Sequence, residues 1–131
     1  MNRLSTAFFG AAVLYALVGM CMGIWMGASG DHTLSPVHAH INLLGWASLA
    51  LMGAFYGLAG AQASKRLGWV NFAVSNLGNL LSLPLLALVL LGDTRVIPVL
   101  AIGELLMVSG MVLFAVSILM VALKRPAMGA A

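Results

Sequence analysis

The chain has 131 residues, of which 63% are hydrophobic and only 7% are charged, and its formal net charge is +3. Soluble domains carry about 25% charged residues, so this composition excludes a protein that faces water on all sides. The mean hydropathy of +1.10 indicates an integral membrane protein that lies in the lipid bilayer. The small positive charge is then no sign of nucleic-acid binding, and we expect no nucleic-acid partner.

Charged residues divide the chain into four apolar intervals. A membrane-spanning helix requires about 20 apolar residues, and each interval holds one such run. Only helices or a closed barrel satisfy backbone groups in lipid, and uninterrupted runs of this length exclude the alternation of a barrel strand. The sequence therefore predicts an all-α membrane protein with a single domain of four transmembrane helices, near residues 4–27, 36–60, 68–91 and 97–123.

The basic residues lie unevenly about these predicted helices. Arg95 falls on one side of the bundle, and the other side carries Arg3, Lys65, Arg66, Lys124 and Arg125. The positive-inside rule then predicts that both termini and the middle loop are cytoplasmic. We expect a multi-pass protein of a bacterial-type inner (plasma) membrane.

The second predicted helix opens with two of the three histidines of the chain. Ser35 is a suitable N-cap, and Pro36 suits the first helical turn, where no backbone donor is needed. His38 and His40 then point roughly 200° apart around the helix, because each residue advances it by about 100°. Two such imidazoles cannot easily bind one small metal ion together, but they can serve two different neighbours.

The residues alone leave three interpretations of these histidines open. Zinc prefers four converging ligands, whereas haem needs one or two axial imidazoles and a large apolar slot. Another metal is the second interpretation, and Met20, Met22 and Met26 invite a copper site near the same end. The third is a structural, hydrogen-bonding role.

Glu104 is the one charged residue inside the fourth predicted helix. A carboxylate within a membrane helix is costly and usually functional. If Pro98 opens this helix, Glu104 lies about 9 Å along it, at the depth that Asn42 reaches after Pro36. We expect one layer to hold His40, Asn42 and Glu104, with Glu104 hydrogen-bonded to a ring nitrogen or to Asn42. The alternative is a protonated carboxyl group that bonds a neighbouring helix.

Small and polar residues mark the helix contacts. Glycines recur every four residues at Gly19, Gly23 and Gly27 and again at Gly53 and Gly57, which predicts close helix packing. The third helix has a polar stripe, which we expect to form interhelical hydrogen bonds: Asn71, Ser75, Asn79 and Ser82. The single cysteine, Cys21, can form no disulfide within the chain, and we expect it to pack inside the protein.

One segment of the second helix resembles the haem-binding helices of the haem-copper oxidase subunit I superfamily, which includes nitric oxide reductases and cbb3-type oxidases: Pro36-Val37-His38-Ala39-His40-Ile41-Asn42-Leu43-Leu44-Gly45-Trp46. In one helix of that superfamily, a His-x-His pair gives one imidazole to each of two haems. In another, a His-x-Asn sequence carries a low-spin haem ligand. The resemblance implies that His38 and His40 are iron ligands of haem b, with Asn42 beside them. The depth argument above adds Glu104 to the same site.

The chain also departs from that superfamily. The oxidase subunit has twelve helices in three arcs of four, and this chain has room for one arc. Nothing in it matches the His-Pro-Glu copper-ligand segment or the cross-linked tyrosine, so we predict no oxygen reduction. The resemblance implies a homotrimer that binds haem for electron transfer or for haem or gas handling, with a redox partner or quinol. The alternatives are a small non-enzymatic membrane subunit or assembly factor with structural histidines, and a copper-binding membrane protein.

Overall fold

The structure, a computed structural model, describes residues 1–124 and is all-α. In this part of the chain four helical spans are long and apolar enough to cross a membrane, and each overlaps one predicted range. The first span is α1 (Arg3–Ser29), and the third is α4 (Lys65–Leu90). The second span is composite: it consists of α2 (Ser35–His40), the π-helix η1 (Ile41–Ala47), α3 (Ser48–Ala59) and the 3-10 turn η2 (Gly60–Gln62). The fourth consists of the 3-10 turn η3 (Thr94–Val96) and α5 (Ile97–Ala122). The prediction of an all-α bundle of four apolar helices is confirmed.

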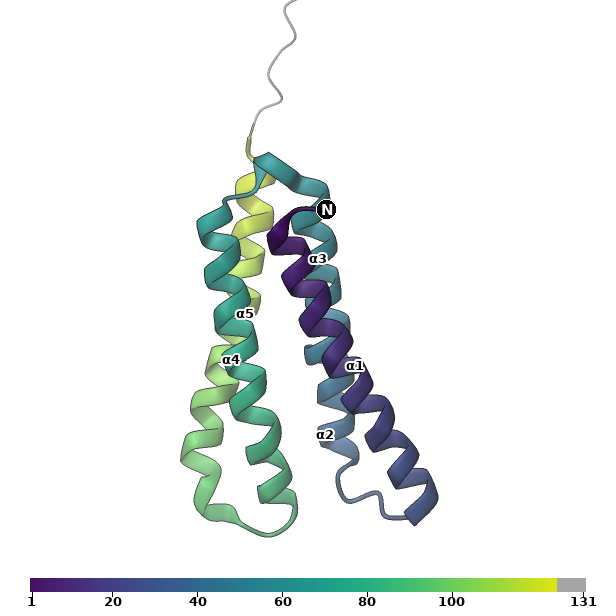
Figure 1. The fold of residues 1–131 in the computed structure, drawn as a ribbon. Helices are drawn as coiled ribbons and strands as arrows, with labels where there is room; N and C mark the ends of the chain where they lie inside the picture. Colours follow the sequence, from purple (N-terminus) through teal and green to yellow (C-terminus); the bar gives the residue numbers. More distant parts are fainter. Residues whose placement is uncertain (125–131) are drawn as a thin grey trace, which may run out of the picture.

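The spans form two antiparallel pairs that lie side by side (Figure 1). α1 packs along η1 and α3, and α4 packs along α5, while α4 joins the two pairs through contacts with α1, α2 and η1. The two pairs are closest at the end where the chain begins. We call this the basic end, because it carries Arg3, Lys65, Arg66 and Lys124. Arg125, which the predicted orientation also used, lies outside the described residues.

The opposite end, which we call the histidine end, holds the loop from Gly30 to Leu34 and the start of α2 and α5. Arg95 lies at this end and donates hydrogen bonds of 2.9 Å to both carboxylate oxygens of Asp93. These bonds lower the pKa of the Asp93 carboxyl group. The described basic residues are thus divided between the two ends as the sequence predicts.

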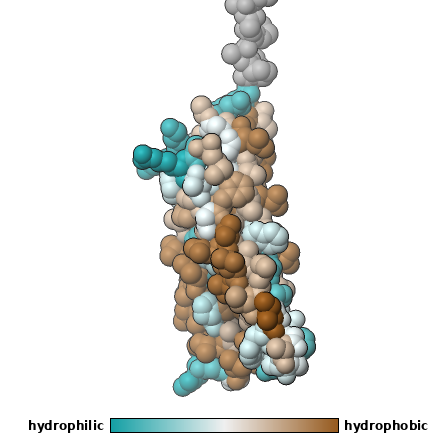
Figure 2. Space-filling model, turned by 45° about the vertical axis from the view of Figure 1, so that its right-hand side comes forward, coloured by the Kyte–Doolittle hydropathy of each residue, from teal (hydrophilic) through white to brown (hydrophobic). Residues whose placement is uncertain are grey.

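The surface between the two ends is largely apolar. Figure 2 shows hydrophobic side chains across the middle of one face, with hydrophilic side chains gathered mainly toward the ends. Large apolar side chains from different spans are exposed there, among them Leu14 (66%), Leu43 (62%) and Leu105 (67%). Such a surface belongs in a lipid bilayer, and the chain is a multi-pass membrane protein by its helix composition. The expectation for Cys21 is wrong, because it lies on the exposed side of α1 rather than inside the bundle.

The predicted glycine stripes are sites of close packing except at Gly27, where an added Cβ would meet nothing within 4 Å. A Cβ added to Gly53 would lie 3.0 Å from Phe8 Cβ, and one added to Gly57 would lie 2.9 Å from Ser5 Oγ. The Ser5 hydroxyl donates a 2.8 Å hydrogen bond to the Gly53 carbonyl across the same contact. Small residues therefore let α1 and α3 approach one another, as their spacing predicts.

The polar stripe of α4 faces the bundle interior. Buried Asn71 donates a 3.0 Å hydrogen bond to the hydroxyl of Tyr56, and Ser75 donates one of 3.0 Å to the Asn71 side-chain oxygen. The Tyr56 and Ser117 hydroxyls are 2.8 Å apart, which links α3, α4 and α5. The interhelical hydrogen bonds expected of this stripe are confirmed for Asn71 and Asn79. Ser75 bonds Asn71 of its own helix, and the Ser82 hydroxyl has no partner among the described residues.

The π-helix η1 interrupts the α-helical part of the second span between α2 and α3. Its wider turns are held from three sides. The Asn79 amide of α4 donates a 3.1 Å hydrogen bond to the Leu44 carbonyl, and the Ser48 hydroxyl donates one of 2.8 Å to the Leu43 carbonyl. Gly45 leaves space for Tyr15 of α1, because an added Cβ would lie 2.6 Å from the Tyr15 ring. Short π segments in helices occur frequently at functional sites.

Candidate functional site

A cavity of about 330 Å³ lies near the histidine end, between the second span and the pair formed by α4 and α5. His40 comes from the last residue of α2, and Glu104 lies seven residues into α5, about 10 Å along that helix. The surrounding wall is mostly apolar: Leu44, Leu83, Leu86, Leu100, Met107 and Met111. The structure therefore brings two of the predicted site residues, His40 and Glu104, to one cavity.

Both ionisable residues are exposed although they lie within membrane spans. Ionisable side chains at this depth rarely face lipid; they almost always face protein or a water-filled cavity. Residues 1–124 leave both side chains exposed at the mouth of this cavity.

The His40 ring is oriented by its own helix. Its Nδ1 atom lies 2.7 Å from the carbonyl oxygen of Pro36, one helical turn earlier. Because a carbonyl oxygen can only accept, Nδ1 carries the proton and the Nε2 atom of the neutral ring keeps its lone pair. A hydrogen bond from Nδ1 to a backbone carbonyl is the usual way in which a metal-binding histidine is held in the Nε2 tautomer.

His38 lies on a different face of the helix, as the predicted angle requires. Its Nδ1 atom lies 2.9 Å from the Gly19 carbonyl oxygen of α1, and a Cβ added to Gly23 would lie 3.0 Å from His38 Cε1. The glycine stripe of α1 thus makes room for this imidazole. The ring is half-buried, and its Nε2 atom bonds no backbone carbonyl among residues 1–124.

Asn42 belongs to the His38 face. Its side-chain nitrogen donates a 2.9 Å hydrogen bond to the His38 carbonyl and lies 3.5 and 3.4 Å from the two ring nitrogens of His38. Nearly equal distances place the amide away from the lone-pair direction of either nitrogen. Gly19 accommodates this amide, because an added Cβ would lie 2.7 Å from Asn42 Nδ2.

The expected layer of His40, Asn42 and Glu104 is therefore wrong in one member. Residues four apart share a helix face, so Asn42 follows His38 toward α1 and away from the cavity. Equal depth along two helices does not bring residues together when they point in different directions. Glu104 forms no hydrogen bond to Asn42 or to a histidine ring in the described part of the chain.

Ser82 is a cavity residue that the sequence did not identify as a site residue. It is 3% exposed and borders the cavity from α4, yet its hydroxyl has no hydrogen-bond partner among the described residues. The small Gly103 of α5 faces it, with an added Cβ only 2.4 Å from Ser82 Oγ. Buried hydroxyl groups are normally paired, so the unpaired Ser82 hydroxyl marks this wall as unusual. The feature of the sequence that pointed to Ser82 is its position as the last residue of the polar stripe, at the end nearest the histidines.

The lining of this cavity offers one imidazole, one carboxyl group and a mostly apolar wall. Residues 1–124 contain no cluster of three or more His, Cys, Asp or Glu side chains that could hold a metal ion. Its volume lies at the small end of the range of about 300–1,000 Å³ for ligand pockets, and it is open on one side. The residues present can supply one imidazole and one face of an apolar slot.

Comparison with known proteins does not assign the chain to a family. No protein-family model matches it, and no curated protein or solved structure matches it.

Proposed function

We propose that this protein binds haem b in the membrane through His40 and serves electron transfer or haem and gas handling. The observation that carries the proposal is the His40 imidazole, whose Nδ1 atom lies 2.7 Å from the Pro36 carbonyl oxygen. Its Nε2 atom has no hydrogen-bond partner among residues 1–124, and the residue lines an open, mostly apolar cavity. An axial imidazole of this tautomer is what haem iron requires. Haem supplies reversible one-electron chemistry when bound, and the resemblance of residues 36–46 supports the same cofactor.

The site requires a second chain. The described part of one chain offers this cavity a single imidazole and one open wall, whereas His38 lies on another face of the same helix. A homotrimer in which each second span lies near the threefold axis gives every cavity His40 of one chain and His38 of the next. Closed rotational symmetry makes this head-to-tail contact self-terminating. The same contact covers the exposed His40 and Glu104 side chains.

The membrane orientation belongs to this proposal. The basic end faces the cytoplasm and the histidine end faces outward, because all described basic residues except Arg95 lie at the basic end. The membrane is a bacterial-type inner (plasma) membrane. The redox partner is a second electron carrier or a quinol that reaches the histidine end. Oxygen reduction is not part of the function, since the chain lacks the copper-ligand segment.

A visible absorption spectrum of the purified protein in detergent tests the proposal. Expression with adequate haem supply should give a Soret band and, after reduction, sharp α and β bands. His40→Ala should abolish this six-coordinate spectrum. His32→Ala is the matched control, because His32 lies in the exposed loop with its ring bonded to the Gly30 carbonyl, and it should leave the spectrum unchanged. A colourless preparation after haem reconstitution would contradict the proposal.

One observation favours the structural alternative for His38 alone. Its ring fills the space left by Gly23 and bonds the Gly19 carbonyl, so it also holds α2 against α1. In a protein with purely structural histidines, His38→Ala would lower stability while His40→Ala would have little effect. The same absorption experiment therefore separates a haem protein from a small non-enzymatic membrane subunit.

A further inference from the structure

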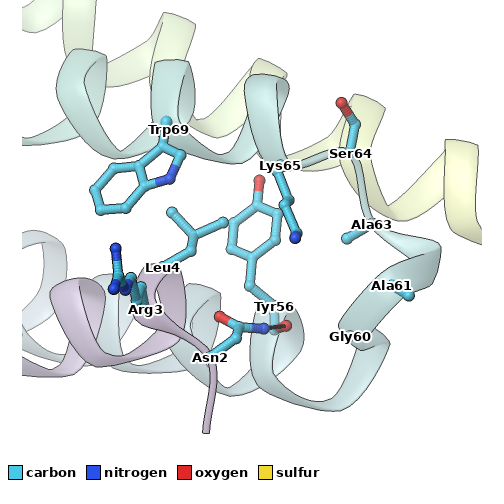
Figure 3. A pocket seen from close by; sticks show the side chains of 10 residues that line it. All are labelled: Asn2, Arg3, Leu4, Tyr56, Gly60, Ala61, Ala63, Ser64, Lys65 and Trp69. Atoms are coloured by element: carbon cyan, nitrogen blue, oxygen red, sulfur yellow. Dashed lines mark hydrogen bonds between the residues drawn. The ribbon is translucent and has the colours of Figure 1, made fainter.

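A second and larger cavity lies at the basic end, at the opposite end of the bundle from His40. Its volume is about 600 Å³, and its walls come from residues 2–4 at the start of α1, Tyr56, the η2 turn and the start of α4. Figure 3 shows the residues around it, with Trp69 and Arg3 on one side and Gly60, Ala61 and Ala63 on the other. Nothing in the proposed haem function uses this cavity.

The polar part of this cavity is positively charged. Arg3 and Lys65 both line it, and neither is paired with a carboxylate in the described part of the chain. They are the first residues of α1 and α4, so two helix N-termini add their partial positive charge at the same place. The cap side chains beside them bond their own helices: Asn2 accepts from Ser5 N–H at 2.8 Å, and Ser64 from Leu67 N–H at 3.3 Å.

The rest of the cavity is apolar. Leu4, Tyr56 and Ala63 line its floor and side, and each is at most 8% exposed. Trp69 stands at the rim with 44% of its surface exposed, in the first two turns of α4. Tryptophan is enriched at the membrane–water interface. The cavity therefore combines two cations at the level of lipid headgroups with an apolar surface that continues toward the hydrocarbon region.

We propose that this cavity binds the phosphate group of an anionic phospholipid. Arg3 and Lys65 hold the phosphate oxygens, and the glycerol and first acyl carbons lie against Leu4 and Trp69. Arginine can bind phosphate oxygens with two parallel donors, whereas lysine acts as a point charge. Basic pockets between membrane helices are typical binding sites for anionic headgroups. The zwitterionic headgroup of phosphatidylcholine would set its own ammonium cation against both side chains and is disfavoured.

Native mass spectrometry of the full chain in detergent tests the proposal. The protein is titrated with phosphatidylglycerol and, separately, with phosphatidylcholine. We expect phosphatidylglycerol to bind more tightly, and Arg3→Gln or Lys65→Gln to weaken its binding about fivefold each. The matched control is Arg66→Gln, which removes the same charge from the same end at a residue that does not line the cavity. It should leave the binding unchanged.

A competition arm distinguishes the source of the phosphate. If inorganic phosphate displaces phosphatidylglycerol, the phosphate alone is the recognised group; if it does not, the site requires the lipid as a whole. Far-UV circular dichroism checks that the variants keep their helices, and Lys65→Gln alone decides if Arg3→Gln fails to fold. Equal binding of the two lipids, or equal loss in Arg66→Gln and Lys65→Gln, would overturn the proposal.

Discussion

At the scale of single residues, the two exposed ionisable side chains of the histidine-end cavity are the features that most require an explanation. Ionisable side chains inside a membrane helix are costly, and they almost always face protein or a water-filled cavity. Glu104 and His40 are uncovered in the single chain, so the cavity they share is where a cofactor and a second chain would stabilise the protein.

Glu104→Gln tests whether this carboxylate acts on the proposed haem. A carboxylate beside the cavity favours the more positive, oxidised iron, so its neutral isostere should raise the midpoint potential. Because Glu104 forms no hydrogen bond to a histidine ring in the described part of the chain, haem retention should change less than the potential. Redox titration followed by absorption provides the measurement.

The control for that experiment is Glu104→Asp, which keeps the charge and should retain most of the potential. Circular dichroism should show unchanged helix content in both variants, since Glu104 forms no hydrogen bond within the described residues. Identical potentials and haem contents in all three proteins would return Glu104 to a structural role.

The sequence predicted some residue positions and missed others for a geometric reason. The angle between His38 and His40 follows from helix geometry alone, and the structure places the two rings on different faces. The same rule places Asn42 with His38 rather than with His40, so helix geometry alone excludes Asn42 from a layer with His40. Ser82 is different, because the lack of a partner for its hydroxyl depends on Gly103 of another helix.

At the scale of elements, the π-helix is the part of the fold that the sequence did not predict. Runs of apolar residues were enough to predict the four spans, because lipid imposes their length and composition. The π turns of residues 41–47 depend on partners far along the chain: the Asn79 amide, 35 residues away, and the Tyr15 ring against Gly45. The sequence of residues 41–47 alone does not predict these contacts. The π-helix begins directly after His40, so a change in its geometry would also move the His40 side chain.

Asn79→Ala tests this dependence. The change leaves the Leu44 carbonyl without its interhelical donor, and such bonds in membrane proteins contribute about 0.6 kcal/mol on average and up to about 1.7. We expect a loss of about 1 kcal/mol in the free energy of unfolding, measured by denaturation from mild detergent into sodium dodecyl sulfate. A displaced His40 should also broaden or shift the haem absorption bands.

Asn76→Ala is the matched control in the same helix. The Asn76 amide donates a 2.8 Å hydrogen bond to the Phe72 carbonyl, one turn earlier in α4. Removing this bond therefore breaks no contact between helices. Its effect on unfolding should be smaller, and the absorption spectrum should not change. If both variants lost the same stability and kept the same spectrum, the Asn79–Leu44 contact would not be what holds η1 in place.

At the scale of the whole molecule, the division of charge between the two ends predicts the orientation in the membrane. Gln62 lies at the basic end and Thr94 at the histidine end, and both are exposed. Cys21 is itself exposed, so the experiment uses a Cys21→Ala background. In intact cells, an impermeant thiol reagent should label Thr94→Cys and leave Gln62→Cys unlabelled until the membrane is broken. The reverse pattern would contradict the positive-inside assignment.

The proposed trimer makes the most specific prediction, because it requires His38 and His40 to act in different chains. His38→Ala and His40→Ala should each abolish every six-coordinate haem when expressed alone. When the two variants are co-expressed in equal amounts, a mixed trimer has one junction where an intact His40 meets an intact His38. Random closed assembly then restores about a quarter of the sites, read as the low-spin absorption signal per chain. Native mass spectrometry should show three chains in the haem-bound species. A monomer that keeps its haem, or no recovery in trimers shown to be mixed, would exclude ligation between chains and leave His40 as a ligand within one chain or as a structural residue.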